Sequence, residues 1–199
     1  MKPTDIQKHI IDVTRELLKE NPDVTIKKIA DASYVNIASV NYYFGSKNQL
    51  FKIVCEDFVN ELKNGLLKLM FEREEGQTEV LLKNIISYLY ERIVENAGIM
   101  NYILQNLGNE QGDMLLKTFF SENEFTKKMF ELFKKQTEIN NKERLFARYT
   151  ILFASFIFPL FIKLSDNHAN RNKYIVDEMF GEMFIKELAF IIRHNPSKE

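Results

Sequence analysis

Residues 25 to 50, TIKKIADASYVNIASVNYYFGSKNQL, constrain the fold of this chain more than any other stretch. Thr25 is a suitable N-cap for one short helix, and Ile29 with Ala30 gives that helix an apolar side. A second short helix is expected at about residues 36 to 43, and it ends where Gly45 breaks the pattern. The spacing predicts two helices joined by a tight turn, the layout of a helix-turn-helix.

The second of these helices has an apolar side and a polar side. Val35 and Val40 can anchor it on the preceding helix, which leaves its other residues exposed. An asparagine amide can bond bidentately to adenine, a serine can bond bases or phosphate, and an isoleucine can contact a thymine methyl group. Lysines and free N–H groups at the starts of neighbouring helices attract phosphates. The predicted DNA-binding residues are Thr25, Lys28, Asn36, Ile37, Ser39, Asn41, Tyr42 and Lys47.

The charge of the whole chain, −1, does not indicate a nucleic-acid partner, but the local charge does. Between Thr25 and Lys52 four lysines stand against one aspartate, a local net charge of +3. A modest positive patch of this kind suits a protein that binds a duplex and must also release it.

At these residues the chain resembles the TetR family of one-component repressors. The resemblance covers roughly residues 5 to 55 and rests on Ile29-Ala30, Val35, Ser39, Tyr42-Tyr43-Phe44, Ser46-Lys47 and Leu50-Phe51. It implies a DNA-binding domain at the N-terminus and a larger helical domain that senses a small molecule and dimerises. It also implies repression rather than activation.

Three residues depart from the family pattern. Tyr34 replaces the usual turn glycine, so the turn either keeps a negative φ or tolerates strain. Ala38 stands where glycine is frequent, and Asn41 stands where tyrosine is frequent. The change at Asn41 alters which base or phosphate is read, so no operator sequence can be carried over from the family.

Glycine and proline are scarce, with seven and four among 199 residues, and both residues break helices. We therefore expect an all-α fold. A three-helix helix-turn-helix DNA-binding domain over residues 1–50 is followed by a larger effector-binding and dimerisation domain over residues 51–199, with about nine helices.

Several helix ends can be predicted from capping patterns. Thr4 with Gln7 opens a first helix, Ser46 with Gln49 opens a long helix that runs to about Phe71, and Ser121 with Glu124 opens another. A charged, glycine-bearing link is expected at residues 72–78. Two long helices, at about 141–165 and 171–194, end the chain.

These last two helices have broad apolar faces, which predict a homodimer. Two helices this apolar need more cover than their own domain supplies, and pairing with a second copy in a four-helix bundle provides it. The alternative is that they are the central core helices of a monomer. A dimer would read two half-sites about one helical turn apart, so we expect a palindromic operator.

Aromatic residues and a methionine in the second domain are candidates to line an apolar or aromatic effector pocket. The plain alternative is that aromatic stripes at helical spacing are core. The predicted effector-binding residues are Tyr102, Phe119, Phe125, Met129, Phe133, Tyr149 and Phe153.

No catalytic residue, metal site or cofactor is predicted, so we expect no enzyme. The three histidines His9, His168 and His194 have no metal-ligand spacing, and there is no glycine-rich phosphate loop. The single Cys55 fits a reducing cytoplasm, and no signal peptide or membrane span is expected. The sequence therefore predicts a cytoplasmic, ligand-responsive DNA-binding regulator, and the alternative is a helical ligand- or protein-binding module that does not bind DNA.

Overall fold

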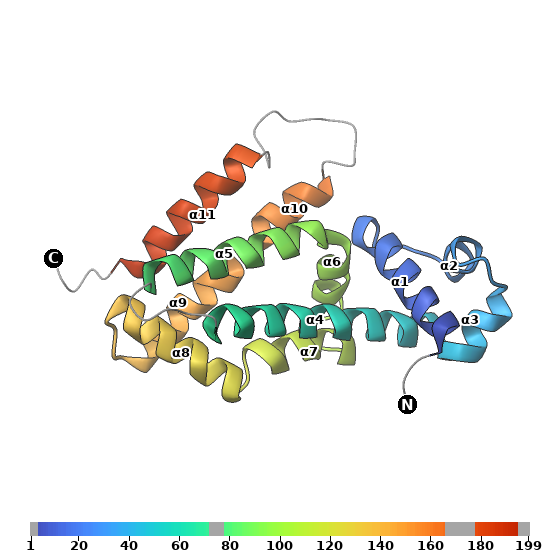
Figure 1. Cartoon of the computed structure of the whole chain (residues 1–199), viewed down its shortest axis with the longest axis horizontal. Coiled ribbons are helices and arrows are strands. Elements are labelled where there is room, and N and C mark those ends of the chain that lie inside the picture. Colours follow the sequence, from blue (N-terminus) through green and yellow to red (C-terminus); the bar gives the residue numbers. More distant parts are fainter. Residues whose placement is uncertain (1–3, 72–77, 166–177, 195–199) are drawn as a thin grey trace. The chain divides into compact units, whose positions relative to one another are not determined.

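The structure, a computed structural model, describes residues 4–71, 78–165 and 178–194. Within these ranges the chain forms eleven helices and no strand (Figure 1). This confirms the all-helical fold, with a three-helix segment at its N-terminus. The helices are α1 (Asp5–Glu20), α2 (Ile26–Ala32), α3 (Ile37–Phe44), α4 (Lys47–Phe71), α5 (Thr78–Glu95), α6 (Ala97–Gln105), α7 (Glu110–Phe119), α8 (Glu124–Thr137), α9 (Lys142–Ala154), α10 (Ile157–Ser165) and α11 (Glu178–Arg193).

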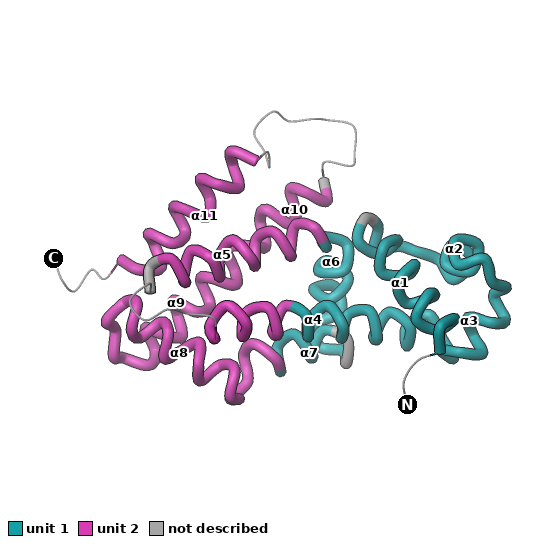
Figure 2. Tube along the Cα trace, in the orientation of Figure 1, with its two compact units in different colours: residues 1–61, 96–117 teal, residues 62–95, 118–199 magenta. Residues whose placement is uncertain are grey.

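The chain divides into two compact units, which Figure 2 colours separately. Unit 1 consists of Met1–Glu61 and Asn96–Lys117, and unit 2 consists of Leu62–Glu95 and Thr118–Glu199. Helix α4 is continuous through this boundary, so residues 47–61 belong to unit 1 and residues 62–71 to unit 2.

In unit 1, α6 packs closely against α1. A Cβ atom added at Gly98 would lie 2.1 Å from the backbone oxygen of Leu18, so only glycine allows this approach. Thr4 starts α1 with the predicted capping box, in which its side chain accepts from the Gln7 amide and the Gln7 side chain accepts from the Thr4 amide. Ile10 and Leu18 of α1 are fully buried in the core of this unit.

The turn between α2 and α3 is a Schellman motif. The Val35 amide donates to the Ala30 carbonyl at 3.0 Å, and the Tyr34 amide donates to the Asp31 carbonyl at 3.2 Å. The motif places Tyr34 in the left-handed region with φ 56°, so of the two predicted options the turn takes the strained one. Gly45 ends α3 with φ 73°, as its position in the sequence predicts.

In unit 2, α11 packs against α5 and α9. A Cβ atom at Gly181 of α11 would lie 3.0 Å from the Tyr90 ring of α5, so the two helices approach closely there. The Arg148 guanidinium of α9 donates to the carbonyl of Ile191, in the last turn of α11, and to that of His194, the residue after the helix. A cation at this end of a helix also complements its dipole.

Two predicted helix boundaries are wrong. The expected helix at 141–165 is broken into α9 and α10 at Ser155 and Phe156. Pro159 accounts for the break, because proline has no N–H to donate to the carbonyl of Ser155 four residues earlier. Helix α8 is capped by Asn123, whose side chain accepts from the Thr126 amide at 3.0 Å, rather than by Ser121.

Other sequence predictions fall outside the described residues. They are residues 72–77 of the link predicted at 72–78, residues 171–177 at the start of the last predicted helix, and His168.

One segment of the described residues, Lys142–Leu164, is long and apolar enough to cross a membrane by length and composition. The core helix of a soluble protein passes the same test, so the segment is weak evidence for a span. Here it comprises two helices, and Leu145, Tyr149 and Leu152 are buried in the core of unit 2.

Candidate nucleic-acid interface and ligand pocket

Helix α3 is anchored on one side and exposed on the other. Val40 is fully buried and Phe44 is nearly so, and both lie on the side that meets α2 and the rest of unit 1. Ile37 is 41% exposed and Tyr42 is 84% exposed, which is unusual for large apolar and aromatic side chains. Asn41 is also exposed. The helix therefore presents an outward ridge of the residue types that read base edges.

Asn36 is the N-cap of α3. Its side-chain oxygen accepts from the Ser39 amide at 2.7 Å and from the Ser39 hydroxyl at 2.9 Å. Both bonds occupy the oxygen, so Asn36 can offer a base or phosphate only its amide NH₂. Bidentate recognition of adenine needs both the oxygen and the nitrogen of one amide, and Asn41 is the α3 asparagine free to supply them.

The starts of α2 and α4 carry the predicted phosphate contacts. Thr25 caps α2 by accepting from the Lys28 amide at 3.2 Å, and both residues are exposed. Ser46 caps α4 by accepting from the Gln49 amide at 3.2 Å. Lys47 follows as the first residue of α4, and its ammonium lies 4.8 Å from the centre of the Phe51 ring. Each helix start combines free N–H groups with a lysine, the arrangement that attracts a phosphate.

An ion pair joins α1 to α4 within unit 1. The Arg15 guanidinium donates through both terminal nitrogens to both carboxylate oxygens of Glu61. This hydrogen bonding raises the pKa of Arg15 above its ordinary value, in spite of partial burial. Sequence reasoning missed the pair because its members lie 46 residues apart.

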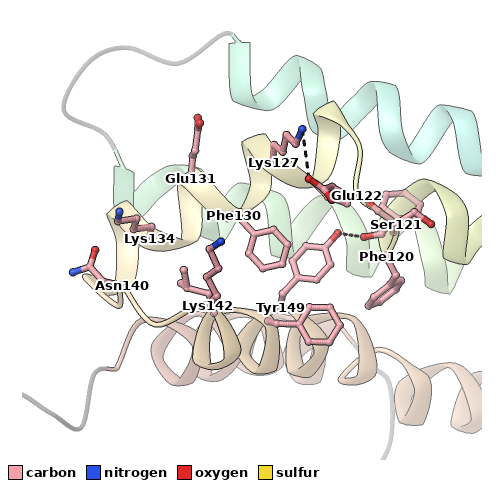
Figure 3. Close-up of a pocket in the computed structure, with 14 residues that line it drawn as sticks. Phe120, Ser121, Glu122, Lys127, Phe130, Glu131, Lys134, Asn140, Lys142 and Tyr149 are labelled. Atoms are coloured by element: carbon pink, nitrogen blue, oxygen red, sulfur yellow. Dashed lines mark hydrogen bonds and ion pairs between the residues drawn. The ribbon is translucent and has the colours of Figure 1, made fainter.

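A pocket of about 590 Å³ lies in unit 2 between α8, α9 and the end of α7 (Figure 3). Its wall is aromatic. The Tyr149 ring lies 5.5 Å from Phe120 and 5.2 Å from Phe130, and Phe130 stacks at 6.4 Å on Phe146. The volume and the apolar wall are those of a small-molecule site. The lining residues are Phe119, Phe120, Ser121, Glu122, Thr126, Lys127, Phe130, Glu131, Lys134, Asn140, Lys142, Leu145, Phe146 and Tyr149.

Tyr149 is the buried centre of this wall. Its hydroxyl donates to the backbone carbonyl of Phe119 at 2.6 Å. Burial raises the pKa of Tyr149 well above its ordinary value, so the phenol stays neutral. Tyr149 is fully buried, so it supports the partly exposed rings of Phe120 and Phe130, and its hydroxyl is already bonded within the protein.

The predicted effector-binding residues occupy three kinds of position. Phe119 and Tyr149 line the pocket, and Phe153 packs on the rings of both at 5.4 and 4.9 Å without lining it. Tyr102 lies in unit 1, where its ring meets Phe51 edge-on at 5.1 Å. The remaining three are buried and fall outside the pocket lining: Phe125, Met129 and Phe133.

Sequence reasoning missed the polar rim of the pocket. Lys127, Phe130 and Lys134 recur at positions i, i+3 and i+7 of α8, which places them on one helix face. That spacing is visible in the sequence. Among the described residues, no group of His, Cys, Asp and Glu side chains is placed to hold a metal ion.

Comparison with known proteins agrees with this arrangement. Residues 10–54 match the family model described as bacterial regulatory proteins, tetR family. Among curated proteins, no sequence matches this chain.

Solved structures match almost the whole chain at low identity. FadR from Bacillus subtilis in complex with stearoyl-CoA has a TM-score of 0.64 at 13% identity, over 94% of this chain and 97% of that one. The fatty acid degradation regulator FadR from Bacillus halodurans has a TM-score of 0.62 at 14% identity, over 98% of both chains. RolR in complex with resorcinol has a TM-score of 0.57 at 14% identity, over 97% of this chain and 90% of that one. At these identities the likeness concerns the fold.

The described structure combines an N-terminal helix-turn-helix segment with a second, larger helical unit. The helix-turn-helix segment at residues 10–54 matches the tetR family, and the fold of almost the whole chain is shared with the solved structures named above.

Proposed function

We propose that this chain is a ligand-responsive repressor that binds a palindromic operator as a homodimer and is released by a small, apolar or aromatic effector. The observation that carries this proposal is the exposed ridge of α3, with Asn41 and Tyr42 outward and Val40 buried beneath. The DNA-binding domain would comprise residues 1–50 and the effector-binding and dimerisation domain residues 51–199, in the cytoplasm.

The homodimer is supported by apolar side chains that the fold leaves uncovered. In α11, Gly181 and Leu188 are buried, whereas Met179 is 73% exposed and Phe190 is 64% exposed. Phe158 of α10 is 72% exposed. Uncovered apolar faces of this kind mark association surfaces, and a second copy of the same two faces would cover them in a four-helix bundle. The alternative of core helices in a monomer does not account for these exposures.

An effector would act through α4, which carries Lys47 at its start. In unit 2 the Lys128 ammonium of α8 lies 4.4 Å from the centre of the Phe71 ring, at the end of α4. Helix α8 also carries pocket residues, among them Phe130. A ligand that moves α8 would therefore act on α4, and a change in α4 alters the spacing of the two recognition helices. Such coupling typically amounts to about 1–3 kcal/mol.

The class of effector is supported by the aromatic wall of the pocket. The complexes of similar fold contain stearoyl-CoA in one case and resorcinol in another, so this fold accommodates both an acyl chain and a small aromatic ring. The wall formed by Phe120, Phe130 and Tyr149 suits a ligand with an apolar or aromatic body.

A selection of bound duplexes from a random pool tests the proposal directly. We expect an enriched inverted repeat with half-sites about one helical turn apart. Binding to random duplex should weaken steeply with salt, with a slope of about −0.9 for each phosphate neutralised. If no sequence is enriched and binding to duplex shows no salt dependence, the chain is instead a helical ligand- or protein-binding module.

A further inference from the structure

The pocket in unit 2 adjoins a second hollow of different character. The second hollow, of about 530 Å³, is lined only by polar and charged residues: Glu131, Lys134, Lys135, Glu138 and Asn140. Glu131, Lys134 and Asn140 line both hollows, so the apolar pocket and the polar hollow meet at these three side chains. A ligand that fills both must be apolar at one end and polar at the other.

The aromatic wall restricts where the polar end of a ligand can be held. The Tyr149 hydroxyl is bonded to the Phe119 carbonyl, and Phe120, Phe130 and Phe146 offer only ring faces and edges. Polar recognition must therefore come from the rim, which is exposed at Lys127, Lys134 and Lys142.

The lysines of the rim differ in their partners. Lys127 pairs with Glu122 at 3.7 Å. Lys134 and Lys142 form no ion pair with any described residue. In Figure 3 Lys142 extends from α9 toward the Phe130 ring, and Glu131 points away from the rings. Three lysines against two glutamates give the pocket a net charge of +1. Lys142 is also the first residue of α9, where the helix dipole adds positive potential.

We infer that this pocket binds an amphipathic organic anion. Its apolar or aromatic body lies against Phe120, Phe130 and Phe146, and its carboxylate or phosphate is held by the ammonium groups of Lys134 and Lys142. The inference rests on the proposed function, because it names the charge class of the effector proposed above. Lysines that bind an anionic group at the edge of an aromatic pocket fix the orientation of the ligand, while the aromatic wall contacts its apolar body.

Calorimetric titration of the intact chain with two matched probes tests the inference. Naphthalene-2-acetate and naphthalene-2-acetamide share one aromatic body and differ in the negative charge. We expect the acid to bind about tenfold more tightly than the amide, because only the acid carries the negative charge that the two exposed lysines attract. Added salt should weaken binding of the acid and leave binding of the amide unchanged.

Two variants distinguish the contribution of the lysine charges to binding from that of the aromatic wall. The double variant Lys134→Met/Lys142→Met should lower the affinity for the acid to that for the amide, because methionine keeps an apolar stem without the charge. Phe130→Leu should weaken both probes equally. Lys83→Met is the matched control, because Lys83 is exposed on α5 and lines neither hollow, and it should leave both affinities unchanged.

Three outcomes overturn the inference: equal affinities of the wild-type chain for the acid and the amide, no binding of the acid at millimolar concentration, or an unchanged acid affinity in the double lysine variant. These titrations contain no DNA, so their result is independent of the proposed regulation. If the chain binds a selected operator but does not bind the acid, the proposal of a DNA-binding regulator stands and the proposal of an anion site is contradicted. If the acid binds selectively and leaves operator affinity unchanged, the site stands and its regulatory role fails.

Discussion

The ammonium of Lys47 lies over the ring of Phe51, 4.8 Å from its centre. Phe51 is fully buried and its ring meets Tyr102 of α6 edge-on, so the lysine charge at the start of α4 rests on a fixed part of the core. A cation in this position over a ring gains about 0.5–1 kcal/mol. The contact holds the Lys47 ammonium, which is proposed to bind a DNA phosphate, in place before DNA is bound. This lowers the conformational entropy that the side chain loses on binding.

Replacing Lys47 with alanine should weaken binding to every duplex by a similar factor. The residue contacts phosphate in this proposal, so its loss should not change the sequence preference of the protein. The slope of log affinity against log salt should fall by about 0.9 for each subunit on the DNA. Fluorescence anisotropy with a selected operator and with random duplex measures both quantities. Lys83→Ala is the control, and a Lys47→Ala variant that loses affinity for the operator alone would contradict a phosphate contact.

Replacing Tyr34 with glycine should stabilise the protein. Tyr34 has φ 56° and is 93% exposed, so the substitution removes backbone strain and few contacts. The left-handed conformation costs about 1–2 kcal/mol for a residue with a Cβ atom, and the extra freedom of an unfolded glycine offsets about 0.4–1 kcal/mol of that. Urea unfolding should show a net gain of about 0.5–1 kcal/mol.

Tyr34→Ala is the matched control for this prediction. Alanine keeps the Cβ atom and therefore the strain, so its unfolding free energy should stay close to that of the wild type. A gain of equal size in both variants would show that the tyrosine ring, rather than the backbone, is the source of the instability.

Features set by local sequence could be predicted, and features set by distant contacts could not. The Thr4–Gln7 capping box and the exposed helix after Asn36 follow from residues three or four positions apart. The approach of Gly98 to Leu18, and the pairing of Arg15 with Glu61, bring together residues that no local pattern relates. The aromatic content of the second unit predicted a pocket wall. The α8 side of the rim has a helical spacing that the sequence shows, whereas the approach of Lys142 of α9 to that side depends on the loop between α8 and α9.

Charges placed on the outer face of α11 should dissociate the homodimer. Met183 is 49% exposed and Phe190 is 64% exposed, so glutamates at these positions leave the fold of the single chain intact. Buried in an interface, the same glutamates would be unpaired charges. Sedimentation velocity at micromolar concentration should show a dimer for the wild type and a monomer for Met183→Glu/Phe190→Glu.

Leu116→Glu provides the control for the dimer prediction. Leu116 is an exposed apolar residue of α7 in unit 1, and it is not part of the proposed dimer faces of α10 and α11. This variant should remain a dimer. A wild-type chain that sediments as a monomer at micromolar concentration would sink the homodimer, and with it the expected inverted repeat.

Stability should fall when the pH rises above about 9, and Cys55 should account for part of the loss. Burial raises the pKa of the Cys55 thiol to about 12, from its ordinary value of 9.0. The folded state therefore keeps the proton that the unfolded state releases between these values. The contribution is fully present below pH 9 and is lost toward pH 12, with a slope of up to about 1.4 kcal/mol per pH unit.

Urea unfolding at several pH values between 8 and about 11 measures this slope. Cys55→Ala should decrease the slope, although the raised pKa values of Tyr102 and Tyr149 leave part of it in place. Because the thiolate is the reactive form, native Cys55 should also resist a thiol reagent that labels the urea-unfolded chain rapidly. Equal labelling rates in the two states, together with an unchanged slope in Cys55→Ala, would show that the thiol is accessible in the folded protein.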